Sequence, residues 1–266
     1  MILFPPAKIN LGLNVRGIRP DGYHEIETCM IQIPINDVLE IVPFDQLTYK
    51  QSGLDVGGEM DDNLVVKAFR LIKEKYGIPD VYLHLLKNIP MGAGLGGGSA
   101  DATYTLVGLN NLFELKLSSS DLQVLAAKLG SDCPFFVNKS FQLAKGRGEI
   151  LNSIELDLKG KYLKIINPGI HIGTKEAYQN VDSSVESNSI LDILEGPMIH
   201  WKEYLKNDFE TFAFDKHPLL QEIKTSLYSE GAIYASMTGS GSTLFGIFST
   251  KPKSTYPSYF ERIVQL

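Results

Sequence analysis

The sequence predicts an α+β protein of two modest domains, and three observations lead to this fold class. Stretches patterned as strands and stretches patterned as helices occur in both halves of the chain. The length of 266 residues exceeds one minimal domain and is too short for three. Around residues 149–158 the pattern becomes irregular, and we place a loose domain boundary there.

The composition argues against several classes of protein. Lys and Arg number 25 against 31 Asp and Glu, a net charge of -6, whereas binders of nucleic acid or anionic membranes normally carry a basic face. Cys29 and Cys133 make no disulfide framework and have no zinc-site spacing. Because no stretch resembles a signal peptide or a membrane helix, we expect a soluble, cytoplasmic protein.

The first element that the pattern predicts is a half-buried strand over Ala7–Val15. Apolar side chains alternate along it and define one face, while Lys8, Asn10 and Asn14 fall on the other. A turn over residues 19–22 and further strands over residues 23–33, 38–42 and 81–86 are expected in the first half.

Capping signals delimit the helices of the first half, which we expect over residues 63–76, from about 99 to 112, and over residues 122–129. Asp62 can cap the first of them, and Gly77 stands at its expected end. Ser118 and Asp121 have capping-box spacing before the third. In the second half we expect strands over residues 162–166, 232–237 and 244–248, and helices over residues 174–179, 201–209 and 218–229.

The most informative segment is the glycine-rich run Pro90–Ser99, in which five of the seven residues from 92 to 98 are glycines. A predicted strand precedes the run and a predicted helix follows it. Glycines let backbone N–H groups approach an anion closely, and a helix N-terminus adds the positive end of its dipole. The run therefore predicts a phosphate-binding loop, with Ser99 placed to bind a phosphate or a metal-bound oxygen.

Two other motifs compete for this segment. Gly92-x-Gly94-x-x-Gly97 matches the dinucleotide fingerprint, which requires a second strand ending in an acidic residue about 20 positions later. The segment that follows is instead patterned as a helix. The P-loop pattern fails because no Gly-Lys-Ser/Thr closes the run. A flexible linker is disfavoured because a strand and a helix flank the glycines.

Four further segments leave two interpretations open each. Lys8 could be a solvated charge or a cation beside transferring phosphate oxygens. Asp132, placed between a helix and an expected strand over residues 135–137, could be a base held ionised by Lys8 or a turn residue bonded to its own backbone. Tyr23 and His24 could bind a ring or be ordinary strand residues. The loop Thr238–Ser242 could be a plain hairpin or a second loop close to a ligand.

Together these segments resemble the GHMP kinase superfamily, which includes galactokinase and the homoserine, mevalonate and phosphomevalonate kinases. Its three motifs correspond here to Pro6–Leu11, Pro90–Ser99 and Met237–Ser242, in the same order. The resemblance implies the two-domain GHMP kinase fold, with a ribosomal protein S5 domain 2-like N-terminal domain over residues 1–154. A ferredoxin-like C-terminal domain would cover residues 155–266.

Within the superfamily the chain is most similar to the branch that phosphorylates the 2-hydroxyl of a cytidine-diphosphate-linked methylerythritol in the non-mevalonate isoprenoid pathway. The segments that carry this similarity are residues 6–13, 19–25, 62–64, 130–136 and 146–149. The resemblance implies ATP as co-substrate, Mg²⁺, a small-molecule cytidyl substrate, and a monomer or weak homodimer without nucleic-acid or membrane partners.

The resemblance also implies roles for individual residues. Lys8 and Asp132 would be the catalytic pair in a direct in-line transfer without a phosphoenzyme. Asn10 would hold the methylerythritol end of the substrate. The residues expected at the cytosine and in the substrate loop are Tyr23, His24, Thr174 and Tyr178. The expected ATP-binding residues are Asn63, Leu64, Lys87, Pro90, Met91, Gly92, Ala93, Gly94, Leu95, Gly96, Gly97, Gly98, Ser99 and Ala100.

Overall fold

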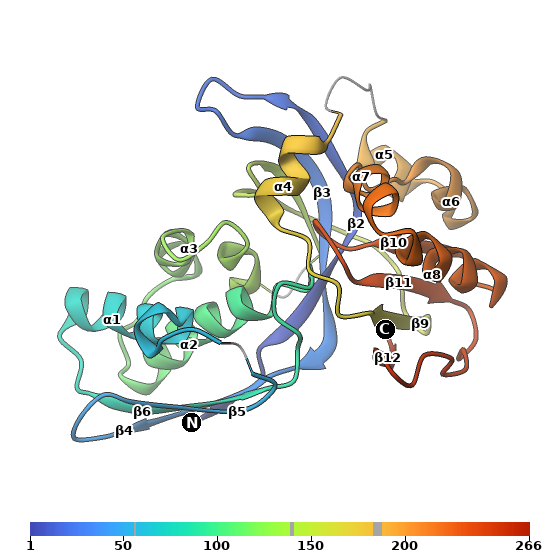
Figure 1. The fold of residues 1–266 in the computed structure, drawn as a ribbon. Coiled ribbons are helices and arrows are strands. Elements are labelled where there is room, and N and C mark those ends of the chain that lie inside the picture. Colours follow the sequence, from blue (N-terminus) through green and yellow to red (C-terminus); the bar gives the residue numbers. More distant parts are fainter. Residues whose placement is uncertain (56, 139–140, 183–187) are drawn as a thin grey trace. The chain divides into compact units, whose positions relative to one another are not determined.

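The computed structural model describes residues 1–55, 57–138, 141–182 and 188–266 (Figure 1). The chain divides into two compact units. The first unit comprises residues 1–7, 35–91 and 96–139, and the second comprises residues 8–34, 92–95 and 140–266. The chain therefore passes between the units several times, whereas the expected domains meet once, at residue 154. That boundary stays a prediction.

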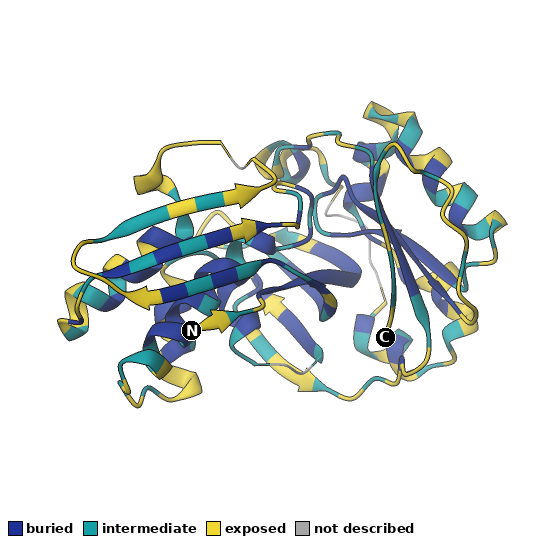
Figure 2. Cartoon of the chain, turned by 90° about the horizontal axis from the view of Figure 1, so that it is seen from below, coloured by how far each residue is buried: buried dark blue, intermediate teal, exposed yellow. Residues whose placement is uncertain are grey.

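The first unit contains a four-stranded sheet with the order β1-β4-β6-β5. Its strands are β1 (Ile2–Leu3), β4 (Val38–Pro43), β5 (Thr48–Gly53) and β6 (Val81–Lys87). β5 pairs with β6 in parallel, and the other pairs are antiparallel. Buried and more exposed side chains alternate along β4 and β6 (Figure 2). This period of two confirms the predicted strands, and only β1 and β5 were not predicted.

Helices cover the buried face of this sheet. The helical elements are η1 (Met60–Asp62), α1 (Leu64–Tyr76), α2 (Gly97–Leu112), α3 (Ser119–Ala127) and η2 (Cys133–Val137). α1 and α2 pack against each other, and α2 also contacts β4. The core between them and the sheet includes Ile41, Phe69, Ile72, Leu83 and Leu106, which are 0–1% exposed.

The N-cap of α1 differs from the prediction. Asn63, rather than Asp62, caps the helix: its side-chain oxygen accepts a hydrogen bond from the Val65 N–H at 2.9 Å. Asp62 instead ends the short 3-10 helix η1, and its Oδ1 accepts a hydrogen bond from the Lys67 ammonium at 3.3 Å. At the other end Gly77 adopts the predicted left-handed conformation, with φ 64°, and its N–H donates to the Lys73 carbonyl.

The segment after α3 also differs from the prediction. The expected capping box is present, with reciprocal hydrogen bonds between Ser118 and Asp121, but the helix ends at Ala127. The strand expected over residues 135–137 is wrong, because these residues form the 3-10 helix η2. Pro134 fixes a helix-compatible φ in its first turn, and the Thr103 hydroxyl of α2 donates to the Cys133 carbonyl at 2.8 Å.

The second unit contains two four-stranded sheets, with the orders β2-β3-β7-β8 and β10-β11-β9-β12. The strands of the first are β2 (Pro6–Ile18), β3 (His24–Asn36), β7 (Phe141–Gly146) and β8 (Ile150–Ile154). Those of the second are β9 (Tyr162–Asn167), β10 (Tyr234–Met237), β11 (Leu244–Phe248) and β12 (Phe260–Gln265). The predicted strands of this unit are confirmed, and β7, β8 and β12 were not predicted.

The half-buried character predicted for β2 is wrong, because every residue from Pro6 to Val15 is buried. The polar face is buried because its side chains find hydrogen-bond partners. The Asn10 amide donates to the Thr28 hydroxyl at 3.0 Å, and the Asn14 amide donates to the Asn188 carbonyl at 2.9 Å. Hydrogen bonds to these partners replace the bonds to water that the polar groups lose on burial, and so offset the cost of desolvation.

The helices of the second unit are α4 (Thr174–Asn180), α5 (Ile190–Glu195), η3 (Met198–His200), α6 (Trp201–Tyr204), α7 (Phe209–Lys216) and α8 (Pro218–Ser229). The single helix expected over residues 201–209 is wrong. The chain leaves the helix at Leu205 because it pairs with β2: the Leu13 N–H donates to the Lys206 carbonyl, and the Asp208 N–H donates to the Leu13 carbonyl. α8 contacts β10 and β11 and confirms the prediction.

Among the described residues, no helix combines the length and the apolar character that a membrane span requires.

The capping assignment of α1 is testable by substitution. Asn63→Ala removes a side-chain acceptor from the first turn, so the free energy of unfolding should fall by about 1 kcal/mol in urea denaturation. Asp62→Ala is the matched control and should change it by less than about 0.5 kcal/mol. A larger loss for Asp62→Ala than for Asn63→Ala would contradict the assignment.

Candidate active site

The glycine-rich run ends in the first turn of α2, which begins at Gly97, two residues earlier than expected. Gly96, the N-cap, has φ 68°, a left-handed conformation that glycine adopts without the strain a side chain would add. The first N–H groups of any α-helix have no intrahelical acceptor, and they carry the positive end of its dipole. In this 16-residue helix they belong to Gly97, Gly98 and Ser99, which gives the start of α2 the character of an anion site.

Within the second unit, the glycine run lies against the loop Thr238–Ser242. A Cβ atom on Gly94 would stand 2.1 Å from the Thr238 carbonyl oxygen, which is closer than any side chain can approach. The Thr238 hydroxyl lies 3.1 Å from the Gly94 carbonyl, and the Thr243 N–H donates to the Ala93 carbonyl at 3.4 Å. The loop is therefore packed against the glycine run, and its predicted place close to a ligand stays a prediction.

Lys8 lies beside the same two loops and is 3% exposed, so the interpretation as a solvated surface charge is wrong. Its Nζ donates to Asn10 Oδ1 at 2.6 Å, and it lies 3.5 Å from the position of a Cβ built on Gly239. Asn10 is itself held by the Thr28 and Thr238 hydroxyls, at 3.0 and 3.1 Å. These hydrogen bonds fix the position of the Lys8 ammonium group through the Asn10 side chain.

A cavity of about 150 Å³ lies in the first unit, next to the start of α2. It is lined by Gly57, Glu59, Asp62, Asn63, Leu64, Leu85, Lys87, Met91, Gly98 and Asp101. Five of these residues were expected at ATP: Asn63, Leu64, Lys87, Met91 and Gly98. The structure thus brings together residues that lie far apart in the sequence. Its volume is below the roughly 300–1,000 Å³ of a whole-ligand pocket, so the cavity suits one part of a ligand.

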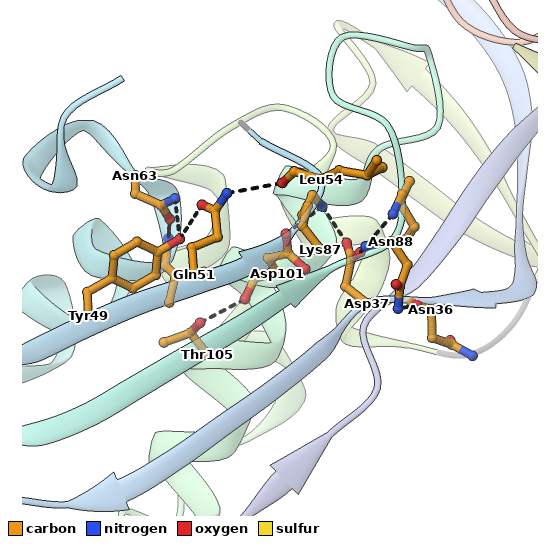
Figure 3. Close-up of polar contacts among 12 residues, drawn as sticks. Asn36, Asp37, Tyr49, Gln51, Leu54, Asn63, Lys87, Asn88, Asp101 and Thr105 are labelled. Atoms are coloured by element: carbon orange, nitrogen blue, oxygen red, sulfur yellow. Dashed lines mark hydrogen bonds and ion pairs between the residues drawn. The ribbon is translucent and has the colours of Figure 1, made fainter. Parts of the chain in front are cut away.

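Two residues of the cavity wall, Lys87 and Asp101, form a buried charged group with Asp37, which lies behind them and does not line the cavity (Figure 3). The ammonium of Lys87, at the end of β6, lies between the carboxylates of Asp37 and Asp101, and the Asp101 Oδ2 contact is 2.8 Å. The second carboxylate oxygen of Asp37 accepts the Asn88 and Ile89 N–H groups at 2.5 and 2.8 Å. The attraction of the two carboxylates offsets the cost of taking the Lys87 ammonium out of water. The sequence analysis did not identify either aspartate.

Asp101 is less completely bonded than Asp37. Its Oδ1 is buried and has no hydrogen-bond partner among the described residues. Burial raises the pKa of Asp101 to about 7, although the neighbouring Lys87 acts in the opposite direction. The available sequence signal for Asp101 was an acidic residue among the small side chains of the first turns of α2, Gly97–Thr103.

The Asn63 side chain is engaged in a chain of hydrogen bonds at the same cavity (Figure 3). Its amide donates to the Tyr49 hydroxyl at 2.8 Å, and that hydroxyl donates to Gln51 Oε1 at 2.9 Å. The side-chain oxygen of Asn63 accepts the Val65 N–H and so caps α1. These bonds fix the rim of the cavity, and burial raises the pKa of Tyr49 to about 12, so its hydroxyl keeps its proton.

Asp132 belongs to the first unit and Lys8 to the second, so their predicted pairing stays a prediction. Asp132 occupies the turn between α3 and η2, at the N-cap position of η2, but its side chain does not cap that helix. In the same unit Ser99 lies close to this turn: a Cβ on Gly130 would stand 4.0 Å from its hydroxyl oxygen.

The residues expected at the cytosine form two separate contacts in the second unit. His24 stacks on Tyr178, with ring centroids 5.0 Å apart, and Tyr178 in turn meets Phe209 edge-on at 4.9 Å. Tyr23 is 56% exposed, and the guanidinium of Arg147 lies 4.7 Å from its ring centroid. The structure thus joins His24, rather than Tyr23, to Tyr178.

The remaining predicted substrate residue, Thr174, begins α4. Its hydroxyl lies 3.2 Å from that of Ser240, so the predicted substrate loop meets the loop Thr238–Ser242 within the second unit.

No three His, Cys, Asp or Glu side chains gather as a metal site within the described ranges. Mg²⁺ that accompanies a nucleotide takes most of its oxygen ligands from phosphates and water. The Ser99 hydroxyl, in the first turn of α2, is an oxygen of the kind that binds Mg²⁺ or a phosphate.

Comparison with family models identifies the class of protein to which the chain belongs. Residues 63–140 match the family model of the GHMP kinases N-terminal domain, and residues 192–255 match that of the GHMP kinases C-terminal domain. These spans include the start of α2 in the first case and the loop Thr238–Ser242 in the second.

Curated relatives then identify the branch. A 4-diphosphocytidyl-2-C-methyl-D-erythritol kinase from Cytophaga hutchinsonii is 48% identical over 96% of this chain and 94% of its own length. One from Azobacteroides pseudotrichonymphae is 50% identical over 93% of each chain. The chain belongs to this family of 4-diphosphocytidyl-2-C-methyl-D-erythritol kinases within the GHMP kinases, which confirms the resemblance found in the sequence.

Solved structures confirm the fold class. A crystal structure of 4-(cytidine 5'-diphospho)-2C-methyl-D-erythritol kinase, 33% identical, matches with a TM-score of 0.81 over 93% of this chain and 90% of that chain. A homoserine kinase from Cytophaga hutchinsonii, 18% identical, shares the fold with a TM-score of 0.67 over 92% and 85% of the two chains. The predicted two-domain GHMP kinase fold is therefore present.

The close approach of the glycine run to Thr238 can be tested with alanine. Gly94→Ala adds both left-handed strain and a clash, whereas Gly58→Ala adds only the strain, since φ is 80° and nothing lies within 4 Å of its Cβ. The loss in unfolding free energy should be greater for Gly94→Ala by about 1–3 kcal/mol in denaturant titrations. Equal losses would show that the backbones do not approach in this way.

Proposed function

We propose that this protein is the ATP-dependent kinase that phosphorylates the 2-hydroxyl of 4-diphosphocytidyl-2-C-methyl-D-erythritol, an intermediate of non-mevalonate isoprenoid synthesis. The names of its relatives supply the substrate class. The observation that carries the chemistry is the buried ammonium of Lys8, held by Asn10 beside the two glycine loops. We also propose that the enzyme works in the cytoplasm, as a monomer or weak homodimer.

ATP would place its phosphates at the glycine run and its base in the cavity beside α2. The unpaired first-turn N–H groups of Gly97–Ser99 favour phosphate oxygens, and the apolar walls made by Leu64, Leu85 and Met91 favour a flat ring. Bound Mg²⁺ would neutralise charge on the β- and γ-phosphates, with Ser99 as its protein ligand. Residues of the glycine run that do not line the cavity would bind ATP through backbone N–H groups rather than through side chains.

The transfer would be direct, from the γ-phosphate to the substrate hydroxyl. Phosphoryl transfer depends on position and charge stabilisation more than on covalent chemistry, which matches a site built from backbone N–H groups and a fixed lysine. Asp132 would accept or orient the hydroxyl proton. Lys8 would stabilise the transferring oxygens, and Asn10 would serve mainly to hold Lys8, since its oxygen already accepts that ammonium.

The cytidyl end of the substrate would lie in the second unit. His24 and Tyr178 already stack on each other, and the exposed ring of Tyr23 could take one face of the cytosine. Thr174, at the start of α4, would contact the linking segment. This assignment gives the kinase its acceptor specificity, because the glycine loops are shared with kinases of other alcohols.

The decisive experiment measures ADP release with the cytidyl substrate, homoserine and mevalonate as separate acceptors. The cytidyl compound should be used at least about 10²-fold more efficiently in kcat/KM than either alternative. Turnover of homoserine or mevalonate instead would reassign the acceptor. Binding of nicotinamide dinucleotide in place of ATP would remove the kinase assignment altogether.

Asp132→Ala should lower kcat by roughly 10²-fold or more and leave KM for ATP nearly unchanged, because the carboxylate would act mainly in the transition state. Steady-state kinetics of purified enzyme make the measurement. Ser131→Ala, one position away in the same turn, is the control and should retain activity. Near-normal turnover of Asp132→Ala would eliminate the proposed base.

Tyr23→Ala should raise KM for the cytidyl substrate by about 10-fold, since stacking on one base contributes roughly 1–3 kcal/mol. Tyr23→Phe keeps the ring and should restore the KM of the unaltered enzyme. If KM does not change in Tyr23→Ala, the cytosine does not stack on this residue, and the His24–Tyr178 pair becomes the better candidate.

A further inference from the structure

The cavity beside α2 has one feature that the roles given above do not use, namely the unpartnered Oδ1 of Asp101. Asp101 is 2% exposed and lines the cavity, and its other oxygen accepts the ammonium of Lys87 at 2.8 Å. A buried acceptor left without a donor keeps the full cost of its removal from water. A ligand that brings an N–H group to this oxygen would recover that free energy.

The neighbouring polar groups cannot play this part (Figure 3). Asp37 does not line the cavity, and its oxygens bind Lys87 and two backbone N–H groups. The ammonium of Lys87 is bonded to both carboxylates. The Asn63 side chain bonds the Tyr49 hydroxyl and caps α1. Of the two buried charged side chains that line the cavity, Lys87 and Asp101, Asp101 carries an acceptor atom without a partner among the described residues.

The shape and chemistry of the cavity indicate which donor it receives. Its volume suits a single ring system, and Leu64, Leu85 and Met91 provide apolar surface against the ring faces. Gly98 of the cavity wall belongs to the first turn of α2, where phosphates would bind, so base and phosphates of one nucleotide can be held together. A carboxylate next to the ring edge attracts an amino group and repels a carbonyl oxygen.

We propose that Asp101 determines the choice of phosphate donor by accepting a hydrogen bond from the 6-amino group of a purine nucleotide, so that 6-oxo purine nucleotides are rejected. This inference rests on the proposed nucleotide-binding function of the cavity. The ionised carboxylate is the form that accepts this bond. Asp101 is therefore a specificity-determining residue, in addition to any part it has in compensating the charge of Lys87.

The test compares ATP with ITP, which differs in carrying a 6-oxo group, by direct calorimetric binding and by kcat/KM. The unaltered protein should prefer ATP by about 10-fold or more, the ratio that corresponds to one unsatisfied buried group. In Asp101→Asn the side-chain oxygen should turn to Lys87 and the NH₂ to the cavity, so the preference should fall by about 10-fold.

Asp37→Asn is the matched control, because it removes a carboxylate from the same lysine but does not line the cavity. It should keep the ATP preference within about 2-fold, whatever it does to stability. An equal loss of preference in both variants would overturn the proposal, since it would reflect the charge of the buried group rather than a contact. An unchanged preference in a folded Asp101→Asn protein would overturn it as well.

A measurement on the unaltered protein covers the case in which Asp101→Asn does not fold. Purine riboside triphosphate lacks the 6-amino group and is smaller than ATP, so any weaker binding cannot come from a clash. It should bind about 10-fold more weakly than ATP, and equal binding would overturn the proposal. Nucleotide binding is measured here without acceptor, so these results are separable from a failure of the cytidyl substrate to react.

Discussion

Gly94 lies so close to the Thr238 carbonyl that no side chain fits at this position. A Cβ atom on Gly94 would stand only 2.1 Å from the carbonyl oxygen. Much of the site in the second unit follows from this contact. The Thr238 hydroxyl lies 3.1 Å both from the Gly94 carbonyl and from Asn10 Oδ1, and Asn10 holds the ammonium of Lys8. A glycine position, a threonine and an asparagine from three distant motifs thus fix one buried lysine.

The two buried lysines of the protein's candidate sites are stabilised in different ways, and the difference suits different tasks. Lys87 lies between two carboxylates, which compensate its charge and make it part of the cavity wall. Lys8 donates to the side-chain oxygen of Asn10 at 2.6 Å, which orients the ammonium beside the glycine run. A lysine of the second kind can stabilise charge that develops on phosphate oxygens, whereas the first kind shapes a pocket.

Sequence reasoning succeeded where the information is local. The period of two along β6, the left-handed Gly77 after α1 and the capping box of α3 are decided by neighbouring residues, and all are confirmed. It failed where a contact with a residue distant in the sequence decides the secondary structure. Leu205–Asp208 leave the helix because they pair with β2, and residues 135–137 follow Pro134 into a 3-10 helix held by Thr103. Tertiary hydrogen bonds override local propensity in both cases.

The sequence by itself determined the kinase class and five of the ten residues that line the cavity, because those follow from short motifs whose chemistry requires particular residues. Only the tertiary structure decided that Lys8 is buried rather than solvated, that His24 stacks on Tyr178, and that Asp37 and Asp101 enclose Lys87. These contacts depend on residues brought together by folding, over separations of up to 228 positions along the chain between Asn10 and Thr238. No local pattern records such contacts, so the acceptor left open at Asp101 was visible only in the folded chain.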